Sequence, residues 1–346
     1  MDKKVTIYDI AAKLNISTAT VNRAINGKPR VSAETRRLVL DTAREMGFKA
    51  NKAAVSLARK TIKIGFLMAE SELDYGHEVL RGARYACERL ADFNVQGDFQ
   101  VVRQSDCPQG MIRIMQDMGQ AGYGGIIMLP QYEMPGCERV IAELSQKQVP
   151  VVTAVSDLPH SKRLFSVRNN TRVSGKMAAE FLAMLAPGKP AAMFTAYKNT
   201  NSLVHQESID GFLQEARLKT LPIVDIYENQ DNPQTAYRAT EKLLREHPDL
   251  GGLYIGTANS GTVCRKISEL GYGGKIKVVA SDIFPELNEY LRQGVIHATI
   301  FQEPSNIGAL AFRYLYEYLA EGRKPESVYT LNPQLVLSSN LELFVR

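Results

Sequence analysis

The chain has 346 residues, of which 45% are hydrophobic and 23% charged, which is typical of globular proteins and excludes a mainly disordered chain. This length predicts two or three domains. No apolar run reaches the ~18–20 residues needed to cross a bilayer, and the first residues lack the apolar core of a secretory signal. Four scattered cysteines without C-x-x-C spacing favour reduced thiols in a cytoplasm over disulfides or a zinc site: Cys87, Cys107, Cys137 and Cys264.

The charge is distributed unevenly along the chain. Residues 1–60 hold 13 Lys and Arg against 5 Asp and Glu, whereas the rest holds 29 against 32. A small basic module before a slightly acidic body indicates a polyanionic partner, because neutralising phosphates releases counterions. Charge alone leaves open a solvated basic arm without a partner.

The basic module has the start and stop signals of three short helices. Each begins after a residue that can cap a helix N-terminus, and glycines follow the second and third. Thr6 precedes residues 7–14, with Asp9 in a near capping-box position. Ser17 precedes residues 18–26 and Ser32 precedes residues 33–46. A helix, a tight turn at 15–16, a second helix and a supporting helix form the order of a helix-turn-helix unit.

The second helix has two unlike faces. At 100° per residue, Val21, Ala24 and Ile25 share one side. We expect this side to pack on Ile7, Ile10, Ala11 and Leu38. The opposite side carries small residues, amides and a guanidinium, namely Thr18, Ala19, Asn22, Arg23 and Asn26. Arg suits guanine and Asn suits adenine in the major groove, so this side can read DNA, although an ordinary amphipathic surface helix has the same periodicity.

The stretch from VTIYDIAAKL through VSAETRRLVL to NKAAVSLARKT resembles the DNA-binding head of the lactose-repressor family. It departs from the family pattern at Leu14-Asn15, where Ala-Gly is usual, and at Asn22, where Ser is usual. The resemblance implies base-reading roles for Thr18, Ala19 and Arg23, and we place Asn22 beside them. It also implies contacts with the DNA backbone by Tyr8, Ser17, Thr20, Asn26, Ser32 and Thr35, although the hydroxyls can equally serve as local caps.

Residues 51–60 resemble the hinge helix of the same family. Asn51 can cap this segment, and Ala54 and Leu57 lie one turn apart, where two such helices could meet. Leu57 matches the residue that wedges into the minor groove and kinks the site. Such a short helix needs DNA and a partner for stability. A linker with one leucine docked on the body is the alternative.

The remainder alternates strand-length apolar runs with amphipathic helical segments. Expected strands cover 62–68, 99–103, 125–130, 149–155, 191–196, 223–229, 251–257, 276–282, 298–302 and 328–337. Expected helices include 75–91, 135–148, 171–186, 203–217, 234–246, 259–270 and 304–321. This alternation predicts an α/β body of two doubly wound parallel sheets, because so many units are too many for one sheet.

The order of these segments resembles the type I periplasmic-binding-protein fold of its ribose-binding-like branch, over about residues 62–342. The resemblance implies a bilobal body in which the chain crosses between lobes three times. We therefore expect a helix-turn-helix domain at 1–50, a hinge at 51–61 and an effector-binding and dimerisation domain at 62–346. The first lobe is expected to hold about 62–160 and 298–325, and the second about 165–295 and the C-terminal segment.

Ligands of such sheets lie at the carboxyl ends of the strands. Asp282, Asn259 and Gln302 each follow a predicted strand and match ligand positions of the family, and a carboxylate such as Asp282 can hold two vicinal hydroxyls. Tyr75, Asp74 and Gln206 are further expected contacts. Each can instead be a cap or a satisfied buried polar group.

Three positions depart from the charged residues usual in the family. Ser208 replaces an arginine, and Asn170 and Val155 replace aspartates. Fewer charges argue against a strongly ionic ligand.

The sequence shows no nucleophile motif, phosphate loop or metal-ligand spacing. We therefore predict a cytoplasmic homodimeric transcription repressor without enzymatic activity, cofactor, metal or membrane partner. It would bind a pseudo-palindromic double-stranded operator and respond to a small effector, a sugar or polyol. A solute-binding protein or an enzyme on the same body fold is the alternative, disfavoured by the basic head and the missing signal. The end of the chain at LELFVR favours a dimer over a tetramer.

Overall fold

The computed structural model describes residues 5–25, 29–48, 60–71, 74–131, 134–198 and 202–345. The chain divides into two compact units, Met1–Lys60 and Thr61–Arg346, which we call the head and the body. The predicted contact residue Asn26 and the hinge residues Asn51, Ala54 and Leu57 lie outside the described residues.

The head contains the three predicted helices, α1 (Ile7–Leu14), α2 (Thr18–Ile25) and α3 (Ala33–Glu45). The capping box of α1 is confirmed, since the Thr6 backbone N–H donates to Asp9 Oδ2 at 2.7 Å and Asp9 N–H donates to Thr6 Oγ1 at 3.4 Å. Ser17 Oγ accepts from Thr20 N–H at 3.1 Å, and Ser32 Oγ accepts from Thr35 N–H at 3.0 Å. Local side-chain chemistry therefore fixes where each helix begins.

The prediction that Leu38 belongs to the core of the head is wrong. The buried cluster consists of Ile10, Ala11, Val21, Ala24, Val39 and Ala43. Leu38 is 54% exposed, and its neighbour Val39 is fully buried instead. Adjacent residues of a helix point about 100° apart, so a small error in the assumed phase of α3 exchanges them.

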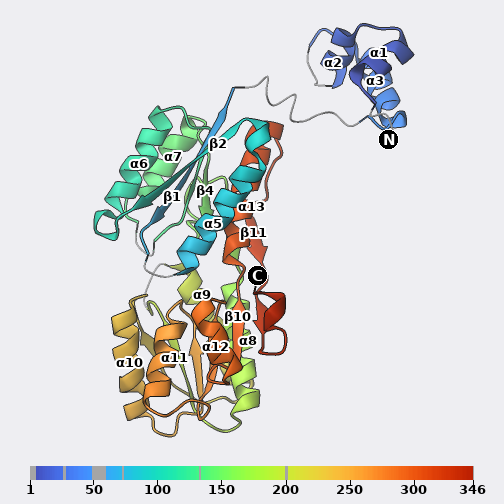
Figure 1. Cartoon of the computed structure of the whole chain (residues 1–346). Helices are drawn as coiled ribbons and strands as arrows, with labels where there is room; N and C mark the ends of the chain where they lie inside the picture. The colour runs from blue at the N-terminus through green and yellow to red at the C-terminus, as the bar shows by residue number, and fades with distance from the viewer. Residues whose placement is uncertain are drawn as a thin grey trace. The chain divides into compact units, whose positions relative to one another are not determined.

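The body is built on two six-stranded sheets, one in each lobe (Figure 1). The first sheet has the order β11-β5-β4-β3-β1-β2 and the second β12-β10-β9-β8-β6-β7. The strands of the first sheet are β1 (Ile62–Ala69), β2 (Val95–Val102), β3 (Gly125–Met128), β4 (Val151–Ala154), β5 (Phe165–Asn169) and β11 (Val328–Leu331). Those of the second sheet are β6 (Ala191–Thr195), β7 (Ile223–Glu228), β8 (Gly252–Ile255), β9 (Lys277–Ser281), β10 (Ala298–Phe301) and β12 (Gln334–Val336).

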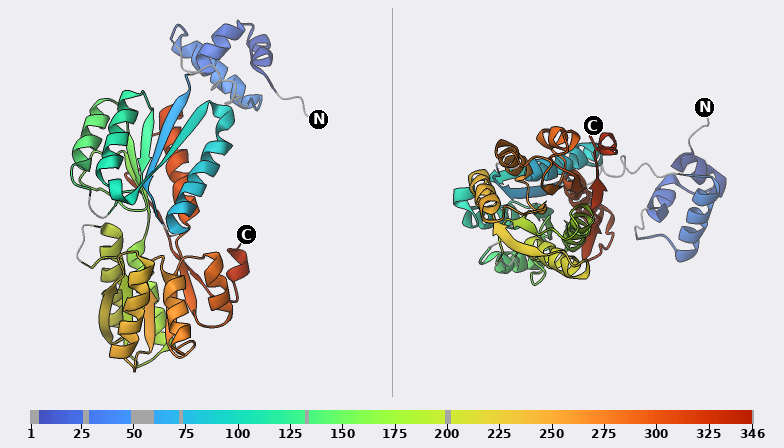
Figure 2. Two further views of the ribbon diagram at one scale, coloured as in Figure 1. Left: turned by 60° about the vertical axis from the view of Figure 1, so that its left-hand side comes forward. Right: turned by 90° about the horizontal axis from the view of Figure 1, so that it is seen from below.

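Helices cover both faces of each sheet, as expected for doubly wound folds (Figure 2). In the first lobe, α5 (Asp74–Arg89) and α13 (Pro304–Glu321) lie on one face, and α6 (Gln109–Gln120) and α7 (Cys137–Gln146) lie on the other. In the second lobe, α8 (Thr171–Leu185) and α9 (Leu203–Leu218) oppose α10 (Pro233–Glu246), α11 (Ser260–Glu269) and α12 (Pro285–Arg292). Among the described residues, no helix is both long and apolar enough to cross a membrane.

The predicted lobe boundaries need correction. Strand β5, assigned from sequence to the second lobe, pairs with β4 and β11 in the first sheet. Strand β10, assigned to the first lobe, pairs with β9 and β12 in the second. The run 328–337 is two strands in different sheets rather than one, interrupted at Asn332-Pro333.

The chain crosses between the lobes three times, as predicted. The crossings follow β5 near residue 170, follow β10 at residues 302–303, and separate β11 from β12 at residues 332–333. All pairings in both sheets are parallel except that of β12 with β10, which is antiparallel. The two sheet orders correspond strand for strand, so the lobes repeat one topology except for the direction of the edge strand, which is parallel for β11 and antiparallel for β12.

Each lobe contains one very close helix pair that depends on glycine. In the second lobe, a Cβ placed on Gly211 of α9 would lie 2.0 Å from the Arg172 carbonyl oxygen, and one on Gly175 of α8 would lie 2.1 Å from that of Ser208. In the first lobe, Gly82 of α5 and Gly308 of α13 face carbonyl oxygens at 1.7 and 1.9 Å. Because backbone cannot move aside like a side chain, only glycine fits at these crossings.

We predict that Gly211→Ala lowers the free energy of unfolding by about 3 kcal/mol, since a methyl group there overlaps the Arg172 carbonyl. Gly273→Ala is the control. Its methyl group would meet Val295 Cγ2 at an ordinary 3.7 Å, so the change should be within about 0.5 kcal/mol. Urea unfolding followed by circular dichroism measures both, and equal stability of the two variants would contradict the close crossing.

Candidate DNA-binding surface and ligand site

The outward side of α2 carries the residues predicted to read bases. Ala19, Asn22 and Arg23 are exposed and Thr18 is half-buried, whereas Val21 and Ala24 are buried against α1 and α3. The structure therefore gives α2 one apolar inner face and one polar outer face. Base reading by these four residues remains a prediction.

Five of the residues predicted to contact the DNA backbone lie in the described part of the head, near helix starts: Tyr8, Ser17, Thr20, Ser32 and Thr35. Tyr8 is 70% exposed in the first turn of α1. Ser17 Oγ lies 2.9 Å from Thr20 Oγ1, and Ser32 Oγ lies 2.7 Å from Thr35 Oγ1. The two serines therefore cap helices, and their contact with DNA remains a prediction.

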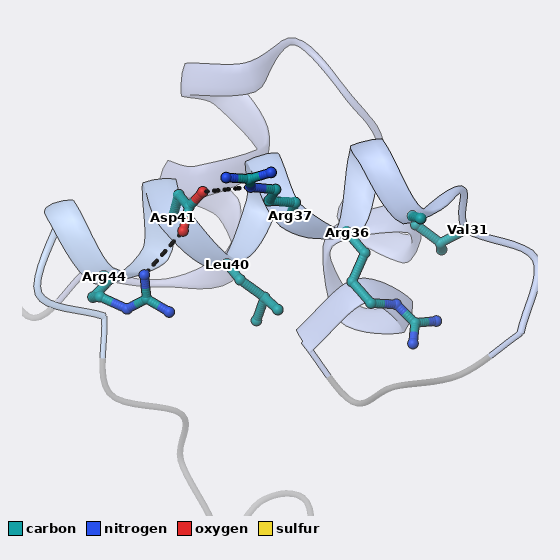
Figure 3. Close-up of a pocket in the computed structure, with 7 residues that line it drawn as sticks. Val31, Arg36, Arg37, Leu40, Asp41 and Arg44 are labelled. Atoms are coloured by element: carbon teal, nitrogen blue, oxygen red, sulfur yellow. Dashed lines mark hydrogen bonds and ion pairs between the residues drawn. The ribbon is translucent and has the colours of Figure 1, made fainter.

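A shallow hollow of about 480 Å³ lies along α3, where the sequence had singled out no site (Figure 3). It is lined by Val31, Ala33, Arg36, Arg37, Leu40, Asp41 and Arg44. Asp41 pairs with Arg44 at 2.9 Å and with Arg37 at 3.9 Å, as the dashed lines show. The lining holds three arginines and a single carboxylate, so this surface is positively charged, which fits the basic balance of the head.

In the body, the polar site is centred on Asp282, which directly follows β9 as predicted. Its carboxylate is buried and accepts two hydrogen bonds from one residue: Gln302 N–H donates to Oδ1 at 2.9 Å, and Gln302 Nε2 donates to Oδ2 at 2.8 Å. The backbone of Asp282 is left-handed, with φ of 64°, and its N–H donates to the Ile300 carbonyl at 2.9 Å. Asp282 and Gln302 thus lie together at the carboxyl ends of adjacent strands.

Burial raises the pKa of Asp282 to about 7, although the two hydrogen bonds from Gln302 act in the opposite direction. Removal from water disfavours the charged form of a carboxylate, and hydrogen bonds donated to it favour that form. Each carboxylate oxygen retains lone-pair capacity beyond its bond from Gln302. The group can therefore accept further hydrogen bonds from a bound molecule.

Tyr75 joins the two lobes at this point. It lies in the first turn of α5 in the first lobe, yet it packs against the apolar cores of both lobes. Burial and then the charge of Asp282 raise its pKa, whereas the side chain of Asn169 acts to lower it. Tyr75, Asn169 and Asp282 are therefore neighbours. Contact of Tyr75 and Asp282 with a ligand remains a prediction.

Asn169 is a member of this cluster that the sequence analysis missed. It ends β5, is 3% exposed, and donates from Nδ2 to the backbone carbonyl of Gln302. The sequence pattern that could have located Asn169 was weak, because Arg168 interrupts the short apolar run of β5 and this strand was not predicted. Recognising that strand would have placed Asn169 at a strand end.

Asn259 lies after β8 at the N-cap position of α11, directly before the helix begins at Ser260, and is 2% exposed. Neither its Oδ1 nor its Nδ2 has a hydrogen-bond partner. Thr195 Oγ1, at the end of β6, is also buried without a partner. Buried polar atoms are almost always satisfied, so these atoms indicate a place for water or ligand at the strand ends.

Two further predicted contacts, Gln206 and Asp74, are exposed. Gln206 is exposed on α9, and its Nε2 donates to Asp210 Oδ1 at 3.2 Å one turn away. Asp74 is exposed in the first turn of α5. Their contact with ligand remains a prediction without a bond to the cluster.

The three positions that depart from the family pattern lie in different structural settings. Asn170 Oδ1 accepts from Val173 N–H at 3.3 Å and so caps α8. Val155 follows β4 with φ of 71°, which is strained for a β-branched residue. Ser208 is buried at the close crossing of α8 and α9.

Within the described residues, no group of three His, Cys, Asp or Glu side chains is arranged to hold a metal.

We predict that, as the pH rises from 4 to 7, the free energy of unfolding of the wild type falls by about 2–4 kcal/mol relative to that of Asp282→Asn. The folded pKa of about 7 lies above the unfolded value, so stability from the protonated form is complete below about pH 4 and is lost as the pH rises. Asparagine keeps the geometry, since it tolerates φ of 64° and can donate to the Gln302 amide oxygen.

Urea unfolding of both proteins across this pH range measures the difference. A difference that does not change with pH would show that Asp282 titrates as an ordinary exposed carboxylate. Comparison with the variant removes the contribution of the other titrating groups.

The comparisons with known proteins agree with this two-part organisation. Residues 64–324 match the family described as "Periplasmic binding protein domain", and residues 6–51 match "Bacterial regulatory proteins, lacI family". The chain is 25% identical to catabolite control protein A of Priestia megaterium, over 94% of this chain and 96% of that protein. It is 23% identical to the HTH-type transcriptional repressor PurR of Pasteurella multocida, over 97% and 98% of the two chains.

Solved structures resemble the body. A glucose-galactose binding protein, GanP of Geobacillus stearothermophilus, is 26% identical with a TM-score of 0.73, and the match covers 82% of this chain and 99% of that one. A solute-binding protein of Burkholderia graminis in complex with D-arabinose has a TM-score of 0.75 at 20% identity, over 83% and 99% of the two chains. The chain therefore belongs to the periplasmic binding protein domain family and carries, ahead of that domain, the helix-turn-helix head of the lacI family of bacterial regulatory proteins.

Proposed function

We propose that this ligand-regulated repressor binds a neutral sugar or polyol at the strand ends around Asp282, Gln302 and Asn259. The observation that carries the proposal is the buried Asp282 carboxylate, which Gln302 holds from one side and which keeps acceptor capacity for hydroxyl groups. The unpartnered amide of Asn259 can both donate to and accept from a hydroxyl.

The charges of this cluster favour a neutral effector. Its described members are one carboxylic acid, carboxamides and a phenol, from Asp282, Gln302, Asn169, Asn259 and Tyr75. An anionic ligand would meet the acid without a cationic partner among them, which is costly in a buried site. GanP is a glucose-galactose binding protein and the Burkholderia graminis protein was solved with D-arabinose, and both support the same ligand class.

On DNA, we propose a homodimer that places two α2 helices in successive major grooves of a pseudo-palindromic operator, with the hinge segments between them. The exposed polar face of α2 and the positive balance of the head support this arrangement. We propose that the protein acts in the cytoplasm, where its DNA lies, and has no enzymatic role.

The effector would act by changing the relation of the two lobes. Tyr75 and the three crossings tie the lobes together at the ligand position, so a bound molecule contacts both. Binding can shift DNA affinity only if the ligand prefers one arrangement of the lobes over another.

We predict that Arg23→Ala weakens operator binding by about 1–3 kcal/mol while binding to random DNA changes little, because a bidentate guanine contact carries sequence information. Tyr8→Phe is a control at an expected backbone position, which should alter both DNAs alike. Fluorescence anisotropy with the operator and with a scrambled duplex gives the two affinities. Equal losses on both duplexes after Arg23→Ala would reduce Arg23 to a phosphate contact.

We predict that Asp282→Asn lowers sugar affinity at least about tenfold, since hydrogen bonds to a charged group contribute about 1.5–3 kcal/mol each. Operator affinity without ligand should remain within threefold, because the head is a separate compact unit. Calorimetric titration with the sugar that stabilises the wild type measures the first quantity and anisotropy the second. Retained sugar affinity would make Asp282 a structural residue, and an unfolded variant would make it a support of the lobe.

A further inference from the structure

Asn169 connects two of the three crossings between the lobes. It is the last residue of β5, where the chain leaves the first lobe, and Gln302 follows β10, where the chain returns. The Asn169 Nδ2 group donates to the Gln302 backbone carbonyl. One side chain of the first crossing thus holds the backbone of the second.

The remaining polar atom of Asn169 has no partner. Its Oδ1 is buried and makes no hydrogen bond, although the residue is only 3% exposed. The orientation of the amide follows from chemistry, because a flipped amide would place Oδ1 against the Gln302 carbonyl oxygen, and two acceptors repel. The free atom is therefore an acceptor, and it needs a donor to offset its desolvation.

The surroundings of this acceptor are those of the ligand site. Tyr75 interacts with both Asn169 and Asp282, and Gln302 bonds to Asn169 through its carbonyl and to Asp282 through both of its N–H groups. Asn169 Oδ1 and the Asp282 carboxylate are thus two acceptors within one continuous network. A molecule that satisfies both must present at least two hydrogen-bond donors.

We propose that Asn169 is a specificity-determining contact of the first lobe, which accepts a hydrogen from one hydroxyl group of the effector on Oδ1 while its Nδ2 holds the second crossing. This proposal rests on the proposed sugar or polyol effector. It assigns two acceptors, Asn169 and Asp282, to separate hydroxyl groups of the same molecule. An effector with an ether or phosphate oxygen at that place would be repelled by the Oδ1 lone pairs.

The adjacent Asn170 supplies a matched control. Both positions hold asparagine, but Asn170 Oδ1 caps α8 by accepting from Val173 N–H. Asn170→Ala should therefore lower the melting temperature through the lost cap and leave sugar affinity within threefold. Asn169→Ala should weaken sugar binding at least about tenfold.

The experiment uses the full-length wild type, Asn169→Ala and Asn170→Ala, titrated calorimetrically with D-glucose, D-galactose, D-arabinose, D-ribose and D-allose. Monodeoxy derivatives of the sugar that binds then locate the hydroxyl. For the wild type, one deoxy sugar should bind at least tenfold more weakly than its parent, and in Asn169→Ala the same pair should differ less than threefold. A merely structural role of Asn169 would weaken all sugars alike and leave that difference unchanged.

A crystal structure of the wild type with the sugar gives a second measurement that needs no variant. A sugar hydroxyl oxygen about 3 Å from Asn169 Oδ1 supports the proposal, and a carbon, a water or an empty space there overturns it. Sugar binding to Asn169→Ala within threefold of the wild type also overturns it and leaves the sugar effector standing. If none of the five sugars binds the wild type, the sugar effector and this role of Asn169 are both rejected.

Discussion

The body depends on one constraint, a carboxylate buried where the two lobes meet. Asp282 retains its position because Gln302 donates to both of its oxygens, and Gln302 in turn accepts from Asn169. These three residues stand at the ends of β9, β10 and β5, so the network spans both sheets. The carboxylate is therefore part of a hydrogen-bond network that joins the two lobes. The pKa of Asp282 is raised because the carboxylate is buried at this place.

Local chemistry explains what the sequence predicts well. The caps at Thr6, Ser17 and Ser32 lie within three residues of their partners, so short-range pattern locates the helices of the head. Asp282 could be placed because it follows a nearly continuous apolar strand. The choice of sheet for β5 and β10 could not be read in this way, because it depends on pairing between segments far apart in sequence.

The same distinction separates the site residues. Gln206 is a predicted ligand contact and Asn170 stands where the family often has an aspartate, and each finds a hydrogen-bond partner within one turn, Asp210 and Val173 N–H respectively. Asn169 bonds to a residue 133 positions away, so this hydrogen bond could not be predicted from local pattern. Asn259 was placed correctly at a strand end, yet its unpartnered amide is visible only once the fold buries it.

The two lobes share one backbone feature but carry different side chains at it. After the fourth strand of each sheet, a non-glycine residue takes a left-handed conformation, and its N–H bonds to the next strand: Val155 to Val167 and Asp282 to Ile300. The turn lets the chain leave the sheet edge at the strand ends, where ligands of such folds bind. In the first lobe this position carries an apolar side chain and in the second an acid. The first lobe instead contributes Tyr75 and Asn169 to the network around Asp282, so two lobes with the same strand order place unlike polar groups at their shared boundary.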